Sequence, residues 1–194
     1  FNKKFPEIPI YNKVEDAFSN SKIGGFTVAT PAETHYLIAK KIIENKKHVL
    51  VEKPLTLTID DAVNLVDLAK INKINLMVGH LLLFHPAIIK IKQIINGGSI
   101  GKLQYIYSNR LNLGKVRTEE NVFWSLAPHD ISIFQYFIEK FPQKIMANGV
   151  SILQKGIHDS TITELKYNNG VEGHIYVSWL HPFKEHRLVI IGSE

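Results

Sequence analysis

The sequence predicts an α/β domain built on a parallel sheet, followed by an α+β domain with a large, open and mostly antiparallel sheet. Up to residue 98, short β-rich runs alternate with amphipathic stretches, which is typical of strand–helix–strand units. Beyond Gly101, segments of alternating polarity predominate, as in strands with one covered face. We therefore expect two domains, residues 1–98 and 99–194, joined near 97–101.

The first domain is expected to contain three strands, each followed by a helix. The strands are expected over 25–29, 48–52 and 75–79. Thr30 is expected to cap the first helix, 32–44, with Pro31 in the first helical position and Glu33 completing a capping box.

The second helix is expected to begin at the cap Thr58, with Asp60 and Asp61 near its positive end. Its buried face would consist of Ala62, Leu65, Val66 and Ala69. A third helix is expected over 86–96 and ends at Gly97-Gly98, where a left-handed cap forms readily.

The second domain is expected to contain one helix and five strands. The helix is predicted over 125–140, and the strands over 103–110, 145–153, 160–167, 171–180 and 187–191. Asn168-Asn169-Gly170 is a strong hairpin signal between two of these strands.

Composition narrows the class of protein. The 194-residue chain is 45% hydrophobic, enough to bury a substantial core. Its longest apolar stretches are interrupted by His and Lys, which argues against a membrane span. The net charge of +5 is scattered and forms no basic stripe, which argues against nucleic-acid binding. Cysteine is absent, so disulfides and Cys-ligated metals are excluded and a cytoplasmic location is expected.

The glycine-rich phosphate turn G-x-G-x-x-G, which a dinucleotide-binding fold carries in its first unit, is absent here. The chain begins at Phe1 without a Met, and residues 190–194 carry no terminating signal. We therefore expect a chain truncated at both ends, which lacks the first strand and helix of the fold. Without the amides of that turn, the chain alone is expected to bind dinucleotide poorly or not at all.

Four blocks of the sequence resemble the Gfo/Idh/MocA oxidoreductase family. Val28-Ala29-Thr30-Pro31 with His35 resembles the family's A-T-P-x-x-x-H signature, and Glu52-Lys53-Pro54 resembles its E-K-P signature. The other two blocks are 77–80 with 84–86, and the helix segment 124–130. The resemblance implies a partial Rossmann-like domain, whose first βαβ elements are missing, followed by an incomplete domain for substrate binding and oligomerisation.

The resemblance also implies an NAD(P)-dependent sugar dehydrogenase. Segments 109–114 and 117–121, together with Trp124, look most like sugar-nucleotide dehydrogenases that oxidise C3 of a UDP-N-acetylhexosamine such as UDP-N-acetylglucosamine. A dehydrogenase of a free sugar or polyol such as inositol, and a non-catalytic sugar-binding relative, are the alternatives. NAD or NADP is the expected cofactor, with NAD favoured. Both are kept because the residue that decides between them is expected upstream of Phe1.

Oxidation of a secondary alcohol needs a base for the hydroxyl proton, while the carbon gives a hydride to the nicotinamide. Lys53 is predicted at the carboxyl end of a parallel strand, where open α/β sheets place ligands. The resemblance implies that Lys53 is catalytic, next to a cis Pro54, and that His129 is a second proton-handling or substrate-orienting group. Many family members carry Asp four residues before this histidine. Here that residue is Ser125, which cannot stabilise an imidazolium as a carboxylate would.

The resemblance places seven residues at the cofactor, namely Thr30, Pro31, His35, Glu52, Lys53, Pro54 and His80. The expected substrate-binding residues are Lys53, Arg110, Asn112, Arg117, Trp124 and His129. Arginine would bind a diphosphate through bidentate bonds, and Trp124 would pack on the substrate. Ordinary roles remain open for several of them: a helix cap for Thr30, core packing for His80, and surface or core packing for the substrate-side residues.

No metal site is expected, because His80 and His85 are five residues apart, as are His181 and His186, and no carboxylate completes a ligand set. A Ser-His-Asp hydrolase is excluded by the lack of a G-x-S-x-G turn. The expected partner is a small sugar or nucleotide sugar, without nucleic acid or membrane. The open second sheet and the resemblance imply a homodimer or homotetramer through the C-terminal sheet.

Overall fold

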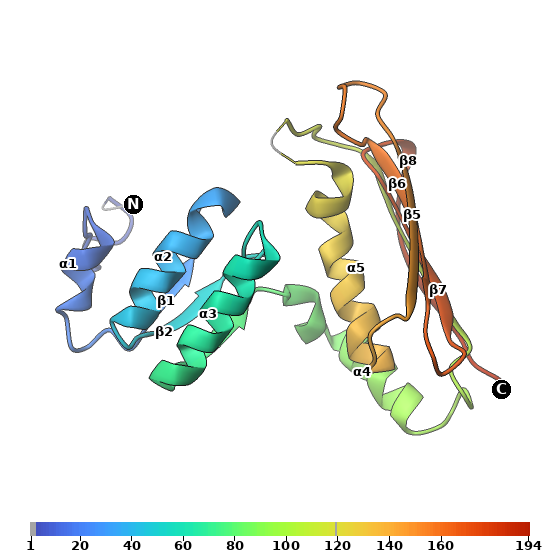
Figure 1. Ribbon diagram of the computed structural model, residues 1–194, viewed down its shortest axis with the longest axis horizontal. Helices are drawn as coiled ribbons and strands as arrows, with labels where there is room; N and C mark the ends of the chain where they lie inside the picture. The colour runs from blue at the N-terminus through green and yellow to red at the C-terminus, as the bar shows by residue number, and fades with distance from the viewer. Residues whose placement is uncertain (1–2, 119) are drawn as a thin grey trace. The chain divides into compact units, whose positions relative to one another are not determined.

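The chain forms two compact units, Phe1–Gly79 and His80–Glu194, in the computed structural model drawn in Figure 1. The structure describes residues 3–118 and 120–194, so Glu119 of the segment 117–121 lies outside the described residues. In those two ranges, no helix is long and apolar enough to cross a bilayer. The units divide before the predicted domain boundary at residue 98, because η1(Leu81–Phe84) and α4(Pro86–Asn96) pack on a helix of the second unit.

The first unit contains a parallel sheet of order β1-β2-β3. Its elements are α1(Val14–Phe18), β1(Gly25–Val28), α2(Ala32–Glu44), β2(His48–Val51), α3(Ile59–Asn72) and β3(Leu76–Val78). Thr27 pairs with Leu50, and Leu50 pairs in turn with Met77. The predicted parallel α/β arrangement is therefore confirmed.

One face of this sheet is buried under α2 and α3. Val28, Val49 and Val51 pack there with helix residues such as Leu65 and Ala69. Val66, expected on the buried face of α3, is 39% exposed, and Leu68 packs there instead. Because successive helix residues are about 100° apart, the stripe through Leu65 and Ala69 continues through Leu68, and Val66 lies on its flank.

The two predicted helix caps have different outcomes. Thr58 caps α3 as expected, since its Oγ1 accepts the amide of Asp61 at 3.2 Å. The predicted cap of α2 is wrong: Pro31 occupies the N-cap position with a ψ of 143°, and no side chain caps the helix. The extended Pro31 carries Thr30 too far from the first amides, and Thr30 Oγ1 instead lies 2.6 Å from Thr34 Oγ1.

The second unit is an α+β unit with a five-stranded sheet of order β5-β6-β7-β4-β8. After η1 and α4 come β4(Tyr105–Leu113), α5(Val122–Ile138), β5(Lys144–Val150), β6(Ser160–Lys166), β7(Glu172–Ser178) and β8(Leu180–Ile191). Only β4 and β7 run parallel within this sheet, and the other neighbours are antiparallel. The predicted open, mostly antiparallel sheet is confirmed, although β8 begins well before residue 187. The hairpin at Gly170, whose φ is +83°, joins β6 and β7 as expected.

The inner face of this sheet packs against α5, as Figure 1 shows. Phe134 of α5 is fully buried. It lies so close to β7 that a Cβ at Gly173 would come within 3.1 Å of its ring and within 2.6 Å of Ile106 O. Glycine at 173 is therefore required for the helix to approach the sheet.

No helix of the described ranges covers the outer face of the sheet, which carries a cluster of aromatic residues. The hydroxyl of Tyr105 lies 2.6 Å from His174 Nδ1, and the ring of Tyr107 stacks on His174 with centroids 4.9 Å apart. Burial lowers the pKa of His174, and Glu164 opposes that effect. The lowered pKa favours a neutral His174, whose Nδ1 can then accept a hydrogen bond from the Tyr105 hydroxyl.

Candidate active site

The carboxyl ends of β1, β2 and β3 meet at one edge of the first unit, because the strands are parallel and in register. Thr30 follows β1, Glu52-Lys53-Pro54 follows β2, and Gly79 follows β3. Open α/β sheets bind ligands at this edge. The structure thus brings together the predicted cofactor residues of the first unit.

His35 joins the turns that follow β1 and β2. It is 1% exposed on α2, and its Nδ1 lies 2.7 Å from the carbonyl of Pro54. Its Nε2 lies 2.8 Å from the carbonyl of Thr30. The histidine therefore links the two turns, and its predicted contact with the cofactor stays a prediction.

Lys53 lies in a turn with a defined backbone. The Lys53–Pro54 peptide bond is cis, as the resemblance implies. The amide of Lys53 donates to Glu52 Oε2 at 3.3 Å, and the amide of Glu52 donates to the carbonyl of Val28 at 2.9 Å. Glu52 thereby remains tied to the sheet while Lys53 begins the turn.

Gly79 allows a close approach at the same edge. Its amide donates to the carbonyl of Val51 at 2.8 Å, and a Cβ there would lie 3.3 Å from the carboxylate of Glu52. This glycine keeps the space beside Glu52 open. Hydroxyl, carboxylate and backbone groups around such a space suit the ribose and nicotinamide end of a dinucleotide. The sequence contains no glycine-rich turn for the pyrophosphate.

In the second unit, α5 carries the predicted histidine. The helix begins at the cap Asn121, whose Oδ1 accepts the amide of Trp124 at 3.1 Å. His129 is half-buried about two turns further along, and Ser125, one turn before it, is buried. Pro128 interrupts the helical hydrogen bonds immediately before His129. Because proline has no N–H, the carbonyl of Trp124 receives no helical donor from it.

Arg110 and Asp130 form a buried bidentate ion pair beside His129. Nε and Nη2 of Arg110 each donate to Asp130 at 2.9 Å. The two side chains are 15% and 4% exposed. The pair fixes the residue next to His129 to β4, and Asp130 accepts two of the five guanidinium N–H groups, so Arg110 could donate to a substrate only through the other three. Its predicted role with a diphosphate stays a prediction.

The remaining substrate-side residues gather at one end of the second unit, hereafter the loop end. Asn112 lies in a β-bulge near the end of β4, and the segment from Gly114 to Asn121 leads from there into α5. Arg117 lies in this segment, pairing with Glu120 at 3.2 Å, and Trp124 on the first turn of α5 is 46% exposed. The loop between β5 and β6 reaches the same end, as Figure 1 shows.

His80 lies at the start of the second unit. Its Nδ1 is buried and makes no hydrogen bond within the described residues. Burial lowers the pKa of His80, which favours the neutral ring. A buried ring nitrogen without a partner suits contact with a bound ligand as well as it suits packing, so the predicted role of His80 stays open.

A cavity of about 280 Å³ adjoins the Arg110–Asp130 pair on the inner face. It is lined by apolar side chains of η1, α4, α5 and β8 and by polar residues that include His85 and His186. Burial and the neighbouring Arg110 and Lys184 lower the pKa of His186, against the opposing effect of Asp130. Among residues 3–118 and 120–194, no group of three or more His, Asp or Glu side chains could hold a metal.

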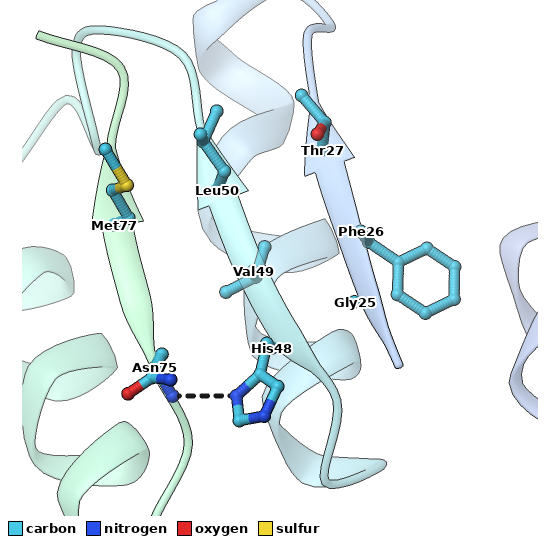
Figure 2. Close-up of a pocket in the computed structure, with 8 residues that line it drawn as sticks. All are labelled: Gly25, Phe26, Thr27, His48, Val49, Leu50, Asn75 and Met77. Atoms are coloured by element: carbon cyan, nitrogen blue, oxygen red, sulfur yellow. Dashed lines mark hydrogen bonds between the residues drawn. The ribbon is translucent and has the colours of Figure 1, made fainter. Parts of the chain in front are cut away.

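Figure 2 shows a second cavity, of about 300 Å³, on the sheet face of the first unit away from α2 and α3. Thr27, Leu50 and Met77 line it, together with His48, whose Nδ1 accepts the amide of Asn75 at 3.1 Å. None of the predicted site residues lies in it. The cavity belongs to the open face of the sheet and not to the strand ends where ligands bind.

Sequence reasoning missed several residues that shape these sites. Asp130 follows the predicted histidine, but its pairing with Arg110 could be seen only once the packing of α5 on β4 was known. Gly79 and Pro128 lie next to predicted residues. The close approach at Gly79 and the missing helical donor at Pro128 could be inferred from the sequence once the strand and the helix were assigned. Asp159, which is fully buried near the loop end, carries no such signal.

Replacement of Asp130 by Asn is expected to lower the free energy of unfolding by about 3–5 kcal/mol, because it leaves a buried guanidinium without its carboxylate. Chemical denaturation measures this difference. The matched control is Asp67→Asn, which breaks an exposed pair with Lys70 at 3.7 Å and is expected to cost less than about 1 kcal/mol. Equal effects of the two substitutions would show that the Arg110–Asp130 pair does not hold α5 to the sheet.

Comparison with known proteins identifies relatives of both units. The family model described as "Oxidoreductase family, NAD-binding Rossmann fold" matches residues 2–80, and the "GFO/IDH/MocA C-terminal domain" matches residues 88–194. The scyllo-inositol 2-dehydrogenase (NAD(+)) of Bacillus subtilis is 27% identical over 203 residues, which cover 99% of this chain and 58% of that protein. The UDP-N-acetylglucosamine 3-dehydrogenase of Acidithiobacillus ferrooxidans is 26% identical over 159 residues, or 81% of this chain and 49% of that protein.

A solved structure shows the same fold. The inositol dehydrogenase homolog of Azotobacter vinelandii, complexed with NADH and myo-inositol, matches with a TM-score of 0.84 at 23% identity, covering 92% of this chain and 51% of that one. The chain spans about half the length of the curated relatives it matches. On the match of both units, the chain belongs to the Gfo/Idh/MocA family of oxidoreductases, with an NAD-binding Rossmann domain and the family's C-terminal domain.

Proposed function

We propose that this protein is an NAD(P)-dependent dehydrogenase, with NAD favoured, which oxidises the C3 hydroxyl of a nucleotide sugar such as UDP-N-acetylglucosamine. The observation that carries the proposal is the placement of Lys53 at the end of β2, in a turn supported by His35 and beside Glu52 and Thr30. Membership of an oxidoreductase family with an NAD-binding domain supports it.

In the proposed reaction, Lys53 takes the proton of the sugar hydroxyl, and His129 orients that hydroxyl or takes part in moving its proton. The nicotinamide ring, when bound, accepts the hydride from the same carbon. Glu52 binds the nicotinamide ribose, in the space that Gly79 keeps open. The Arg110–Asp130 pair fixes the backbone next to His129 and so limits how far its ring can move.

The nucleotide part of the substrate is proposed to bind at the loop end. Trp124 offers a half-exposed indole for packing, and Arg117 offers a guanidinium near it for the diphosphate. The similarity to a UDP-N-acetylglucosamine 3-dehydrogenase supports this choice. The similarity to a scyllo-inositol dehydrogenase over nearly the whole chain favours the second candidate, a polyol dehydrogenase.

Replacement of Lys53 by Ala, in the protein expressed from its complete reading frame, is expected to lower kcat by about 10²–10⁴-fold, because the hydroxyl proton loses its base. Binding of NAD is expected to weaken much less than kcat falls, because the other predicted cofactor residues remain, and fluorescence titration with NADH measures it. The control is Lys70→Ala, an exposed lysine on α3 outside the strand edge. Wild-type turnover in Lys53→Ala would remove the proposed mechanism.

A turnover screen separates the two candidate substrates. We expect reduced nicotinamide with UDP-N-acetylglucosamine and none with scyllo-inositol. In Trp124→Ala, the KM for the nucleotide sugar is expected to rise by about tenfold, since the indole loses its packing on the substrate. Phe141→Ala, at an 83% exposed residue, is the control. Turnover of the polyol alone would favour the second candidate.

We further propose that the outer face of the C-terminal sheet mediates a homodimer or homotetramer. Tyr105, Tyr107 and Tyr176 lie on this face, and it is rimmed by the ion pair of Lys166 and Glu172 at 2.8 Å. An uncovered aromatic patch with a polar rim is typical of protein–protein interfaces.

Replacement of Tyr107 by Lys is expected to shift the protein toward monomer, because a charge would be buried at the centre of the proposed interface. Sedimentation velocity over a range of protein concentrations measures the change. The control is Phe141→Lys, at an 83% exposed residue between α5 and β5, outside the strands of the sheet. If the wild type is monomeric, or the two variants associate alike, the outer face does not serve as the interface.

A further inference from the structure

Asp159, at the end of the loop between β5 and β6, is a fully buried carboxylate with no role in the proposed chemistry. Its Oδ1 accepts the indole N–H of Trp179 at 2.6 Å. Its Oδ2 accepts the amides of Ile152 and Leu153 at 2.7 and 2.9 Å. Burial raises the pKa of Asp159, but these three donors and the nearby His158 together lower it below its usual value, which favours the ionised group. An anion bound by three donors holds their segments firmly in place.

The segments that meet at Asp159 also hold the loop from Gly114 to Asn121. At its start, the amide of Gly114 donates to the carbonyl of Trp179 at 3.0 Å. In its middle, Gln154, which follows Leu153, donates from Nε2 to the carbonyl of Arg117 at 2.9 Å.

The end of this loop is held in the same way. The amide of Val122, the first residue of α5, donates to the carbonyl of His158 at 2.9 Å. His158 is the residue before Asp159 and fits closely against β5, where a Cβ at Gly149 would lie 2.9 Å from its ring. The three attachments therefore come from Trp179, which donates to Asp159, from Gln154, which follows the donor Leu153, and from His158, which precedes Asp159.

We infer that Asp159 is a positioning residue, which fixes the described residues 114–118 and 120–121 of this loop through Trp179, Gln154 and His158. The loop carries Arg117 and leads into the helical turn of Trp124, so Asp159 determines where both side chains meet the nucleotide sugar. The substrate in this inference rests on the proposed function, whereas the attachment of the loop rests on the hydrogen bonds alone.

The test compares three variants of the protein expressed from its complete reading frame. Asp159→Asn keeps the shape of the side chain but offers one acceptor oxygen instead of two, so either the indole or the pair of amides loses its partner. Trp179→Phe removes one donor and leaves the two amide bonds. Thr163→Val is the control, because Thr163 is 3% exposed on the adjacent strand β6 and its hydroxyl has no hydrogen-bond partner in the described structure.

In Asp159→Asn, the KM for UDP-N-acetylglucosamine is expected to rise by at least about tenfold, as for the loss of a hydrogen bond to a charged group. The KM for NAD is expected to stay unchanged, because the predicted cofactor residues of the strand edge lie in the first unit. Hydrogen exchange should accelerate by a similar factor at residues 151–158 and at 114–124, but not in α4. Trp179→Phe should show smaller effects of the same kind, and Thr163→Val none.

Two results would overturn the inference. In one, exchange accelerates at 151–158 while 114–124 keeps its wild-type protection, so that Asp159 holds only its own loop. In the other, both segments loosen and the KM for the sugar nucleotide does not change. If the wild type oxidises no sugar, the proposed function fails, and exchange at 114–124 still decides whether Asp159 positions the loop. If Asp159→Asn does not fold, Trp179→Phe provides the same comparison.

Discussion

The buried imidazole of His35 links the turns that follow two parallel strands. The geometry of the edge where the carboxyl ends of β1, β2 and β3 meet depends on this link. Its two ring nitrogens contact the carbonyls of Thr30 and Pro54, which belong to the turns that follow β1 and β2. Parallel pairing brings the strand ends to one edge, but it does not fix the turns beyond them. The side chain of α2 supplies that constraint, so Lys53 starts from a fixed backbone beside Glu52.

In the second unit, buried carboxylates fix the helix that carries His129 and the loop before it. The Arg110–Asp130 pair ties the middle of α5 to β4, and Asp159 ties the loop that leads into the same helix. Both carboxylates are almost fully buried, so each depends on its donors for compensation. The helix that carries His129 is thereby held at its start by hydrogen bonds to the loop end and further along by an ion pair.

Much of this arrangement could be predicted from the sequence. The structure agrees with four predictions: the parallel alternation of strands and helices, the hairpin at Gly170, the cap Thr58 and the cis peptide before Pro54. Each of these depends on local residues or on a specific family signature. The cap of α2 could not be predicted from the S/T-x-x-E pattern, since the extended Pro31 displaced Thr30. The contacts of Asp130 and Asp159 could not be predicted either. Each joins residues about twenty positions apart in the sequence, which only the folded second unit brings together.

In the proposed reaction, the amine of Lys53 and the imidazole of His129 act on one sugar hydroxyl. A crystal structure of the protein, expressed from its complete reading frame, with NADH and UDP-N-acetylglucosamine tests it most directly. We expect Lys53 Nζ and a ring nitrogen of His129 both to lie within hydrogen-bond distance of the C3 oxygen, with C3 facing the nicotinamide. A complex in which the sugar contacts only one of the two residues, or lies away from the edge that follows β2, would contradict it.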